Sequence, residues 1–147
     1  MEIKNKATRL YAAYGSNMCI KQMMTRCPGA KKVGNLYLPN FALTLPFYAD
    51  MEKVRESMGI KTPIGLWEIN RKDEATLDIA EGVAEGSYYK TDINVELNSG
   101  KFPALVYLMT EKYKKSNGIA RVGYNDIIKQ GYRDFGFDDS KFNPLNI

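Results

Sequence analysis

The chain contains no histidine, and this absence restricts the chemistry open to it. Without imidazole there is no Ser-His-Asp triad, no Cys-His pair and no histidine proton shuttle, and the usual zinc and non-haem iron ligand sets are lost. Acid–base chemistry therefore falls to a carboxylate, Lys, Tyr, Cys, water or the substrate itself. We predict no metal site and no cofactor.

Cysteine is scarce as well, since Cys19 and Cys27 are the only two. On a helix they would lie roughly 12 Å apart, which is too far for a disulfide. The first residues are charged, and no apolar run is long enough for a signal peptide or a membrane span. Free thiols and the missing apolar run predict a soluble, cytoplasmic protein that does not bind membranes.

The length of 147 residues and mass of 16.7 kDa suit one domain that buries its core without disulfides or metals. No internal repeat, low-complexity tract or flexible linker divides the sequence, so we expect residues 1–147 to form a single domain. The net charge of +4 is too small to demand a polyanionic partner. No signature of nucleic-acid recognition is present, and we expect no nucleic-acid partner.

Strand-like and helix-like segments alternate along the chain, and strands are the more numerous. Expected strands cover 9–13, 32–45 with a bend at Pro39-Asn40, 63–69, 87–97 and 102–109; expected helices cover 18–26, 50–58, 70–81 and 121–135. The last two strands are joined by Asn98-Ser99-Gly100, a hairpin signal. Most connections are too short for parallel crossovers. The pattern predicts an α+β fold, with a mixed, largely antiparallel sheet curved into a small barrel and two or three flanking helices.

The segment 10–18 runs from an apolar strand through Tyr14-Gly15-Ser16-Asn17 into the first expected helix. Such a turn presents unpaired backbone N–H groups, which together with the helix N-terminus bind a carboxylate, a phosphate or a developing oxyanion. Gly, Ser and Asn dominate turns everywhere, so a plain capped turn is the more common explanation of these residues when they are considered alone.

Glu81 occupies the last turn of an expected helix and is followed by Gly82. A carboxylate there faces the negative helix end, at a cost of about 0.3 to 1 kcal/mol, and burial adds to that cost. Both effects favour the protonated form, so they raise the pKa and make the group a better base near neutral pH. The structural alternative is an exposed glutamate before a C-cap glycine.

Tyrosine is abundant, and several copies stand at the ends of different elements. Tyr88 and Tyr89 open one expected strand, Tyr107 lies near the end of another, and Tyr124 begins the last helix. Core packing accounts for most tyrosines, but a hydroxyl at a pocket rim can orient a polar substrate. The scattered Lys and Arg residues, including the cluster at 112–115, are typical of a solvated surface.

The order of these motifs is similar to that of the gamma-glutamyl cyclotransferase family, also called the AIG2-like or BtrG-like fold. Residues 10–18 resemble its strand and Tyr-Gly-Ser-Asn loop, and 63–69 its strand with a Gly-aromatic core. Residues 77–82 resemble its helix ending in Glu-Gly, 104–113 its later Tyr-containing strand and 121–137 its closing helix. Met18 replaces the usual Leu, a near-isosteric change. The resemblance covers most of the chain.

The resemblance implies a metal-independent acyl transfer of lyase type, in which the substrate's α-amino group attacks its own γ-carbonyl. The products are 5-oxoproline and a free amine or amino acid. Glu81 would be the catalytic acid–base. Substrate binding would fall to the backbone of the first loop, to two orienting tyrosines and to one pocket-lining methionine: Tyr11, Ala12, Ala13, Tyr14, Gly15, Ser16, Asn17, Tyr88, Tyr124 and Met109.

Three questions stay open at the level of sequence. A non-catalytic module that binds a small carboxylate or amine is the alternative, although a pure binder has no need of a carboxylate at Glu81. The Tyr-Gly-Ser-Asn loop differs from the Tyr-Gly-Ser-Leu loop of the glutathione-specific ChaC branch, which argues against glutathione as substrate. The leaving amine and the oligomeric state, a homodimer among the options, are not fixed by the sequence.

Overall fold

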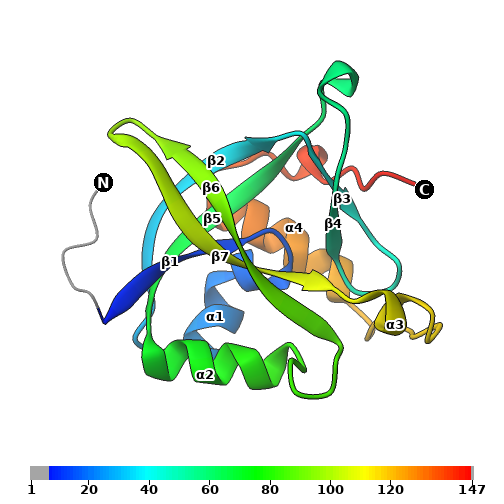
Figure 1. Cartoon of the computed structure of the whole chain (residues 1–147), viewed down its shortest axis with the longest axis horizontal. Helices are drawn as coiled ribbons and strands as arrows, with labels where there is room; N and C mark the ends of the chain where they lie inside the picture. Colours follow the sequence, from blue (N-terminus) through cyan, green and yellow to red (C-terminus); the bar gives the residue numbers. More distant parts are fainter. Residues whose placement is uncertain (1–6, 147) are drawn as a thin grey trace.

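The computed structural model describes residues 7–146, which combine seven strands with four α-helices (Figure 1). The strands are β1 (Thr8–Ala13), β2 (Lys31–Pro39), β3 (Phe41–Thr44), β4 (Asp50–Lys53), β5 (Lys61–Asn70), β6 (Tyr88–Leu97) and β7 (Gly100–Met109). The α-helices are α1 (Ile20–Arg26), α2 (Arg71–Ala80), the single turn α3 (Glu111–Lys114) and α4 (Tyr124–Asp134); 3₁₀ turns are η1 (Ser16–Met18), η2 (Glu56–Met58) and η3 (Asp139–Lys141). The predicted α+β class is confirmed.

The main sheet has the strand order β2-β5-β1-β7-β6, and β3 and β4 form a separate ribbon. Only β1 and β7 are parallel, through Leu10 opposite Ala104 and Tyr11 opposite Leu105, whereas the other neighbours are antiparallel. Since β2 and β6 remain unpaired edges, the sheet is curved but open. The predicted barrel is therefore a loose description.

The central strands are buried, which explains their continuous apolar sequences. In β1, residues 10–13 are at most 4% exposed, and β5 buries its Trp67 at 1% exposure. Trp67 Nε1 donates a hydrogen bond to the carbonyl oxygen of Asn17 at 3.0 Å. The core strand β5 thus holds the turn that follows β1.

Helix α4 packs closely against η1, and Gly131 makes this approach possible. A Cβ atom at Gly131 would lie 2.5 Å from Met18 Cβ and 2.7 Å from the Cys19 backbone nitrogen. A larger residue would push α4 away from the turn that carries Ser16 and Asn17. Cys19 itself is buried and, like Cys27, is a free thiol.

The helix expected over residues 50–58 is wrong. Asp50–Lys53 forms strand β4, paired with β3, and only Glu56–Met58 makes a turn of 3₁₀ helix. Asp50 is 1% exposed, accepts the Met109 backbone N–H at 2.9 Å and pairs with Lys114 Nζ at 3.1 Å. These tertiary contacts outweigh the helical propensity of the segment.

Smaller differences concern turns. The bend expected at Pro39-Asn40 separates β2 from β3, with Asn40 at φ 66°. The hairpin between β6 and β7 pairs Leu97 with Gly100, so its loop has two residues, one fewer than expected. Helix α4 begins at Tyr124, three residues after the expected start, because Gly123 at φ 84° precedes it as N-cap.

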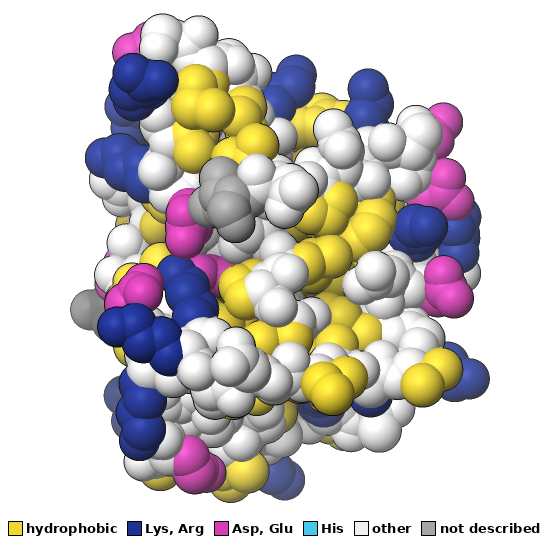
Figure 2. All heavy atoms as spheres, turned by 90° about the vertical axis from the view of Figure 1, so that its right-hand side faces the viewer, with side chains coloured by type: hydrophobic (Ala, Val, Ile, Leu, Met, Phe, Trp, Pro, Cys, Tyr) yellow, Lys and Arg dark blue, Asp and Glu magenta, His cyan; other side chains and the backbone are white. Residues whose placement is uncertain are grey.

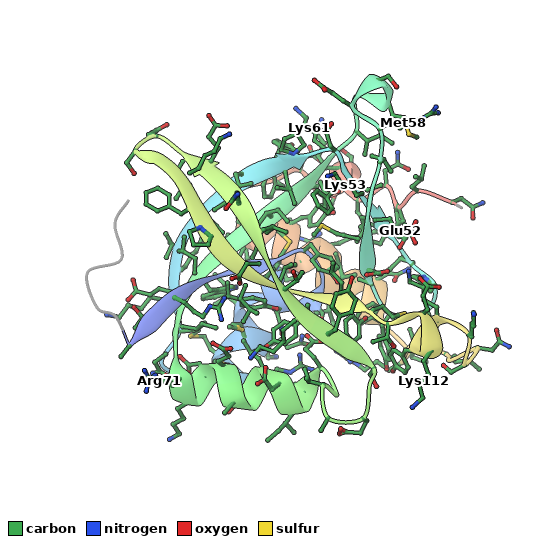
Figure 3. All side chains as sticks on the ribbon, viewed as in Figure 1. Glu52, Lys53, Met58, Lys61, Arg71 and Lys112 are labelled. Atoms are coloured by element: carbon green, nitrogen blue, oxygen red, sulfur yellow. The ribbon has the colours of Figure 1, made fainter. Side chains whose placement is uncertain are left out.

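Charged side chains lie mainly at the periphery, as the labelled Lys53, Lys61, Arg71 and Lys112 show (Figure 3). On the face that carries β3, β4 and α3, hydrophobic side chains gather in the middle and Lys and Arg stand towards the margins (Figure 2). Lys114 departs from the expected solvated surface, because it bridges Asp50, Glu52 and Glu111. No helix within residues 7–146 is long and apolar enough to cross a membrane.

Candidate active site

A cavity of about 300 Å³ opens where the C-terminal end of α2 meets the turn after β1. The end of α2, the loop after it, the start of β6, β7, the loop before β4, α3 and the loop between α3 and α4 contribute further walls. Eight of the predicted site residues line it: Tyr11, Tyr14, Gly15, Ser16, Asn17, Glu81, Tyr88 and Tyr124. Residues from four separate parts of the sequence thus meet around one space.

Glu81 is the C-cap of α2, and its half-buried carboxyl group faces this cavity. The last turn of α2 contains no basic residue to offset the negative helix end. Burial of the carboxyl group raises the pKa of Glu81 from 4.5 to about 7, and the Arg26 guanidinium opposes part of this rise. The group can therefore both accept and return a proton near neutral pH.

Asn17 connects Glu81 to the turn after β1. Its Nδ2 donates to Tyr11 Oη at 3.0 Å and, more weakly, to Glu81 Oε1 at 3.4 Å. Its Oδ1 accepts from Gln22 Nε2 at 3.1 Å and from Arg26 Nη1 at 3.0 Å. Because Asn17 is only 3% exposed and fully engaged, its amide fixes the carboxyl group relative to the turn.

Tyr88 and Tyr124 hold the backbone of Ala49 between them. Tyr88 Oη donates to the Ala49 carbonyl oxygen at 2.6 Å, and the Ala49 N–H donates to Tyr124 Oη at 3.0 Å. Burial raises the pKa of Tyr124 to about 12, so the hydroxyl stays protonated. Tyr124 accepts from Ala49 and also interacts with the side chain of Ser16, so its hydroxyl group connects the Ala49 backbone to the turn after β1.

An aromatic wall extends from Tyr124 to the loop before β4. Tyr48 packs edge-on against Tyr124 with ring centroids 4.8 Å apart, and Phe47 packs against Tyr113 at 4.8 Å. Tyr113 also contacts Tyr88 at 5.9 Å. Since Tyr48 and Tyr113 line the cavity, this wall makes one side of it rigid and apolar.

Three predicted binding residues do not line the cavity. Ala12 and Ala13 are buried in β1, at 0% and 1% exposure, and Met109 is buried at the end of β7. Gly15 lines the cavity, but with φ −116° it does not need the left-handed conformation that a turn glycine can supply. Close approach explains this glycine, since a Cβ would lie 3.3 Å from Ala49 Cβ and 3.5 Å from Tyr124 Oη.

The sequence did not predict that two arginines line the cavity. Arg26 ends α1 and Arg121 precedes α4, and both line the cavity. A basic residue in the last turn of a helix is the ordinary complement to the helix dipole, so nothing local marks Arg26 as a site residue. Arg121 lies in a loop, and only tertiary packing brings it against Tyr48 and Tyr124.

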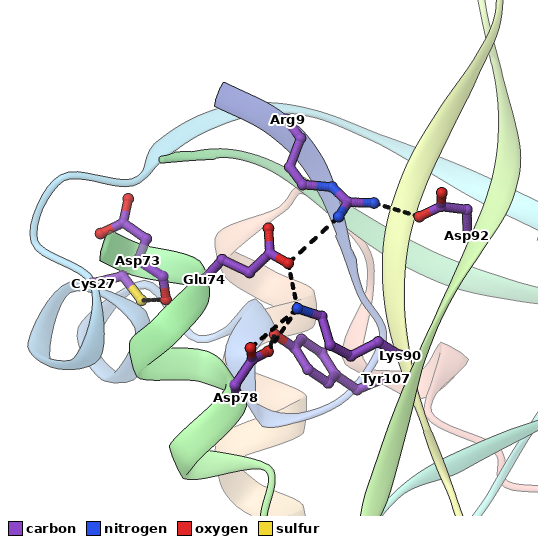
Figure 4. Close-up of polar contacts among 8 residues, drawn as sticks. All are labelled: Arg9, Cys27, Asp73, Glu74, Asp78, Lys90, Asp92 and Tyr107. Carbon is purple, nitrogen blue, oxygen red and sulfur yellow. Dashed lines mark hydrogen bonds and ion pairs between the residues drawn. The ribbon is translucent and has the colours of Figure 1, made fainter. Parts of the chain in front are cut away.

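A network of charged side chains anchors α2 to the sheet (Figure 4). Lys90 of β6 pairs with Glu74 and, at 3.0 Å, with Asp78, while Arg9 of β1 reaches Glu74 at 3.4 Å. Tyr107 Oη donates to Asp78 Oδ1 at 2.7 Å. Asp78 precedes Glu81 by one helical turn, so these contacts fix the end of the helix that carries the carboxyl group.

The comparison with known protein families identifies the chain. The model of the AIG2-like family matches residues 64–138, slightly more than half of the sequence, including all of α2 and Glu81. The chain belongs to the AIG2-like family. Among residues 7–146, this AIG2-like protein places no group of three or more Cys, Asp or Glu side chains that could hold a metal ion.

Individual relatives of this AIG2-like chain are gamma-glutamylcyclotransferases. The mouse protein is 31% identical over 113 residues, and the match covers 70% of this chain and 60% of the relative. The bovine protein is 28% identical over 101 residues, which cover 63% and 54%. The match thus spans between about half and three-fifths of the length of these curated relatives.

The solved structure of a gamma-glutamyl cyclotransferase has the same fold. It superposes with a TM-score of 0.73 and covers 95% of this chain and 90% of its own, although only 22% of the residues are identical. At that identity the similarity speaks for the fold. The arrangement of an open mixed sheet with flanking helices is therefore that of gamma-glutamyl cyclotransferase-like structures.

Proposed function

We propose that this AIG2-like protein is a gamma-glutamyl cyclotransferase that releases 5-oxoproline from small γ-glutamyl compounds. The observation that carries the proposal is Glu81, whose pKa of about 7 belongs to a single half-buried carboxyl group at a cavity. The names of the mouse and bovine relatives support the same reaction. The reaction needs no nucleophile from the enzyme, which agrees with a chain that has no histidine.

The reaction begins at the substrate's α-ammonium group. Glu81 in its ionised form accepts a proton from this group, and the neutral nitrogen attacks the γ-carbonyl carbon. A new C–N bond closes the five-membered ring and leaves a tetrahedral oxyanion. Because nucleophile and carbonyl belong to one molecule, the protein has only to fold the glutamyl chain into the reactive conformation.

Collapse of this intermediate breaks the original γ-amide bond. Two protons leave the attacking nitrogen in all, and both reach the departing nitrogen, which leaves as an ammonium group beside 5-oxoproline. Glu81 relays them, because a group with a pKa of about 7 releases a proton as readily as it accepts one near neutral pH. No co-reactant is required for this balance.

Binding of the glutamyl part falls to the turn after β1. The residues Tyr14, Gly15, Ser16 and Asn17 line the cavity beside Glu81, with Tyr14 fixed by a 2.5 Å hydrogen bond from its hydroxyl to the Tyr107 carbonyl oxygen. In our proposal the Tyr124 hydroxyl group, which lies beside Ser16, orients the substrate, and Tyr88 secures the Ala49 backbone behind it.

The proposal is tested by release of 5-oxoproline from a panel of γ-glutamyl amino acids and γ-glutamylamines. Wild type should turn over at least one member, and Glu81→Gln should lower kcat/KM by at least about 10²-fold. Glu96→Gln, the same change at an exposed position of β6 outside the cavity, is the matched control and should be unaffected.

Two results would contradict the proposal in different ways. Equal rates for wild type and a folded Glu81→Gln variant would remove Glu81 as the acid–base group. Binding of panel members without any 5-oxoproline would favour the alternative, a non-catalytic module for small carboxylates or amines. Circular dichroism of each variant separates both results from a failure to fold.

A further inference from the structure

Two guanidinium groups face the cavity without a carboxylate partner. Arg26 Nη1 donates to the amide oxygen of Asn17 at 3.0 Å, and Arg121 Nη2 donates to the amide oxygen of Gln22 at 2.8 Å. None of the ion pairs within residues 7–146 involves either arginine. A guanidinium group whose side-chain hydrogen bonds go to neutral amides remains available to a carboxylate ligand, which its planar fork matches.

The acidic side chains that line the cavity form no ion pair with these two arginines within residues 7–146. Glu81 and Glu85 line it, but Glu85 is exposed at the rim and forms no ion pair with a described residue. Glu81 contacts the amide of Asn17 in place of a cation. The cavity therefore suits a ligand with carboxylates of its own.

The two arginines occupy different parts of the cavity. Arg26 shares Asn17 with Glu81 and is the cation that acts on the Glu81 carboxyl group. Arg121 lies against the aromatic wall instead, 5.9 Å from the Tyr48 ring centroid and 5.4 Å from that of Tyr124. It reaches Asn17 only through Gln22, so it lies outside the immediate surroundings of Glu81.

The proposed chemistry assigns one carboxylate to the Arg26 side. The α-amino group must lie beside Glu81 to lose its proton, and the glutamyl α-carboxylate is bonded to the same carbon as that amino group. It therefore falls near Arg26 and the turn at Asn17. This leaves Arg121 for a second carboxylate, which only the leaving part of the substrate can supply.

We propose that Arg121 determines specificity by binding a carboxylate on the leaving group. This inference rests on the proposed function and sharpens it, because it selects γ-glutamyl amino acids over γ-glutamylamines. The hydrogen bond to Gln22 and the contacts with Tyr48 and Tyr124 hold the guanidinium group in place before the substrate binds. Less side-chain entropy is then lost when the carboxylate arrives.

The test compares two substrates that differ by one carboxylate, γ-glutamyl-alanine and γ-glutamyl-ethylamine. Wild type should prefer γ-glutamyl-alanine by about 10- to 100-fold in kcat/KM, the range of a charged hydrogen bond. Arg121→Gln should remove this preference and change the rate for γ-glutamyl-ethylamine less than about threefold, because the amine substrate never contacts the guanidinium group. Lys115→Gln, which removes one exposed positive charge outside the cavity, should keep the preference.

The possible outcomes separate this inference from the function it rests on. If 5-oxoproline forms but wild type treats both substrates alike, Arg121 has no such role and the cyclotransferase activity stands. If Arg121→Gln lowers both rates equally, Arg121 supports the aromatic wall and the inference is again overturned. If a folded wild-type protein forms no 5-oxoproline from either substrate or from the wider panel, both proposals fall.

Discussion

The two ends of helix α2 differ in how their charges suit the helix dipole. At its N-terminus, Asn70 Oδ1 accepts the Asp73 N–H at 2.8 Å and Asp73 Oδ2 accepts the Asn70 N–H at 3.1 Å. This reciprocal capping box satisfies two backbone donors. Asp73 and Glu74 also place negative charge where the helix dipole favours it. The capping box and these two acidic residues stabilise this end, although Arg71 and Lys72 place positive charge in the same turn.

At its C-terminus the same helix accepts an unfavourable charge. Glu81 stands at the negative end with no basic residue in the last turn, and burial raises its pKa to about 7. Gly82, at φ 63°, ends the helix so tightly that a Cβ there would lie 2.8 Å from Ser87 Oγ. Natural proteins tolerate locally unfavourable residues mainly where function requires them. The difference between the two ends of α2 therefore indicates that the functional site lies at Glu81.

The largest expected effect concerns Glu81 at the C-terminus of α2, and it is the pH dependence of the reaction. Only ionised Glu81 can accept the first proton, so kcat/KM should fall about tenfold per pH unit below pH 7, to about 1% at pH 5. Rates for γ-glutamyl-alanine between about pH 5 and pH 9 measure this limb. If kcat/KM instead falls with a midpoint near pH 4.5, or if the same fall persists in Glu81→Gln, Glu81 is not the titrating group.

Removal of the charge at Glu81 should stabilise the protein at alkaline pH. A carboxyl group whose pKa is raised on folding binds its proton more tightly in the folded state, so the ionised form costs stability. The cost is absent below about pH 4.5 and complete above about pH 7. Glu81→Gln should therefore raise the free energy of unfolding by about 1–3 kcal/mol at pH 8 and hardly change it near pH 4. Urea unfolding at both pH values checks this, and equal effects at the two would contradict it.

A substitution at the N-terminus of α2 should change stability in the opposite direction. Asn70→Ala removes the cap and should lower the free energy of unfolding by about 1–2 kcal/mol at all pH values between about 5 and 8. The specific activity of the folded fraction should stay unchanged, because Asn70 lies at the far end of α2 from the cavity. Thermal unfolding and kcat of the same sample test both statements. A tenfold loss of kcat with native folding would mean that the two ends are not independent.

The contrast between the ends also explains what the sequence reveals. The capping box and Glu81 are readable because both concern neighbours along one helix. The cavity role of Arg26 and of the exposed Arg121 cannot be read in this way, because only the packing of α1 and of the loop before α4 brings these two residues to the cavity. Strand β4 was missed for the same reason, since its pairing with β3 and the buried Asp50 involve residues distant in sequence.

The role of Glu81 as acid–base group stays a prediction, as does the organisation of residues 1–147 as one domain. The turn 14–17 was predicted from its Gly, Ser and Asn residues, and it does line the cavity. Ala12, Ala13 and Met109 do not, because they are buried within β1 and at the end of β7. The order of motifs in the sequence thus predicted which elements form the site better than it predicted which residues line the cavity.

The smallest effect is expected in the middle of α2, where Lys90 joins Glu74 and Asp78. Lys90→Met should cost about 0.5–1 kcal/mol, because Glu74 keeps Arg9 and Asp78 keeps the Tyr107 hydroxyl as partners. High salt should narrow the difference in stability between the two proteins, since it screens partly exposed ion pairs. Rates should change less than about twofold, as Asn17 and the helix backbone still hold Glu81. A tenfold lower kcat/KM in folded Lys90→Met would instead show that these ion pairs set the position of Glu81, and that the functional end depends on the middle of the helix.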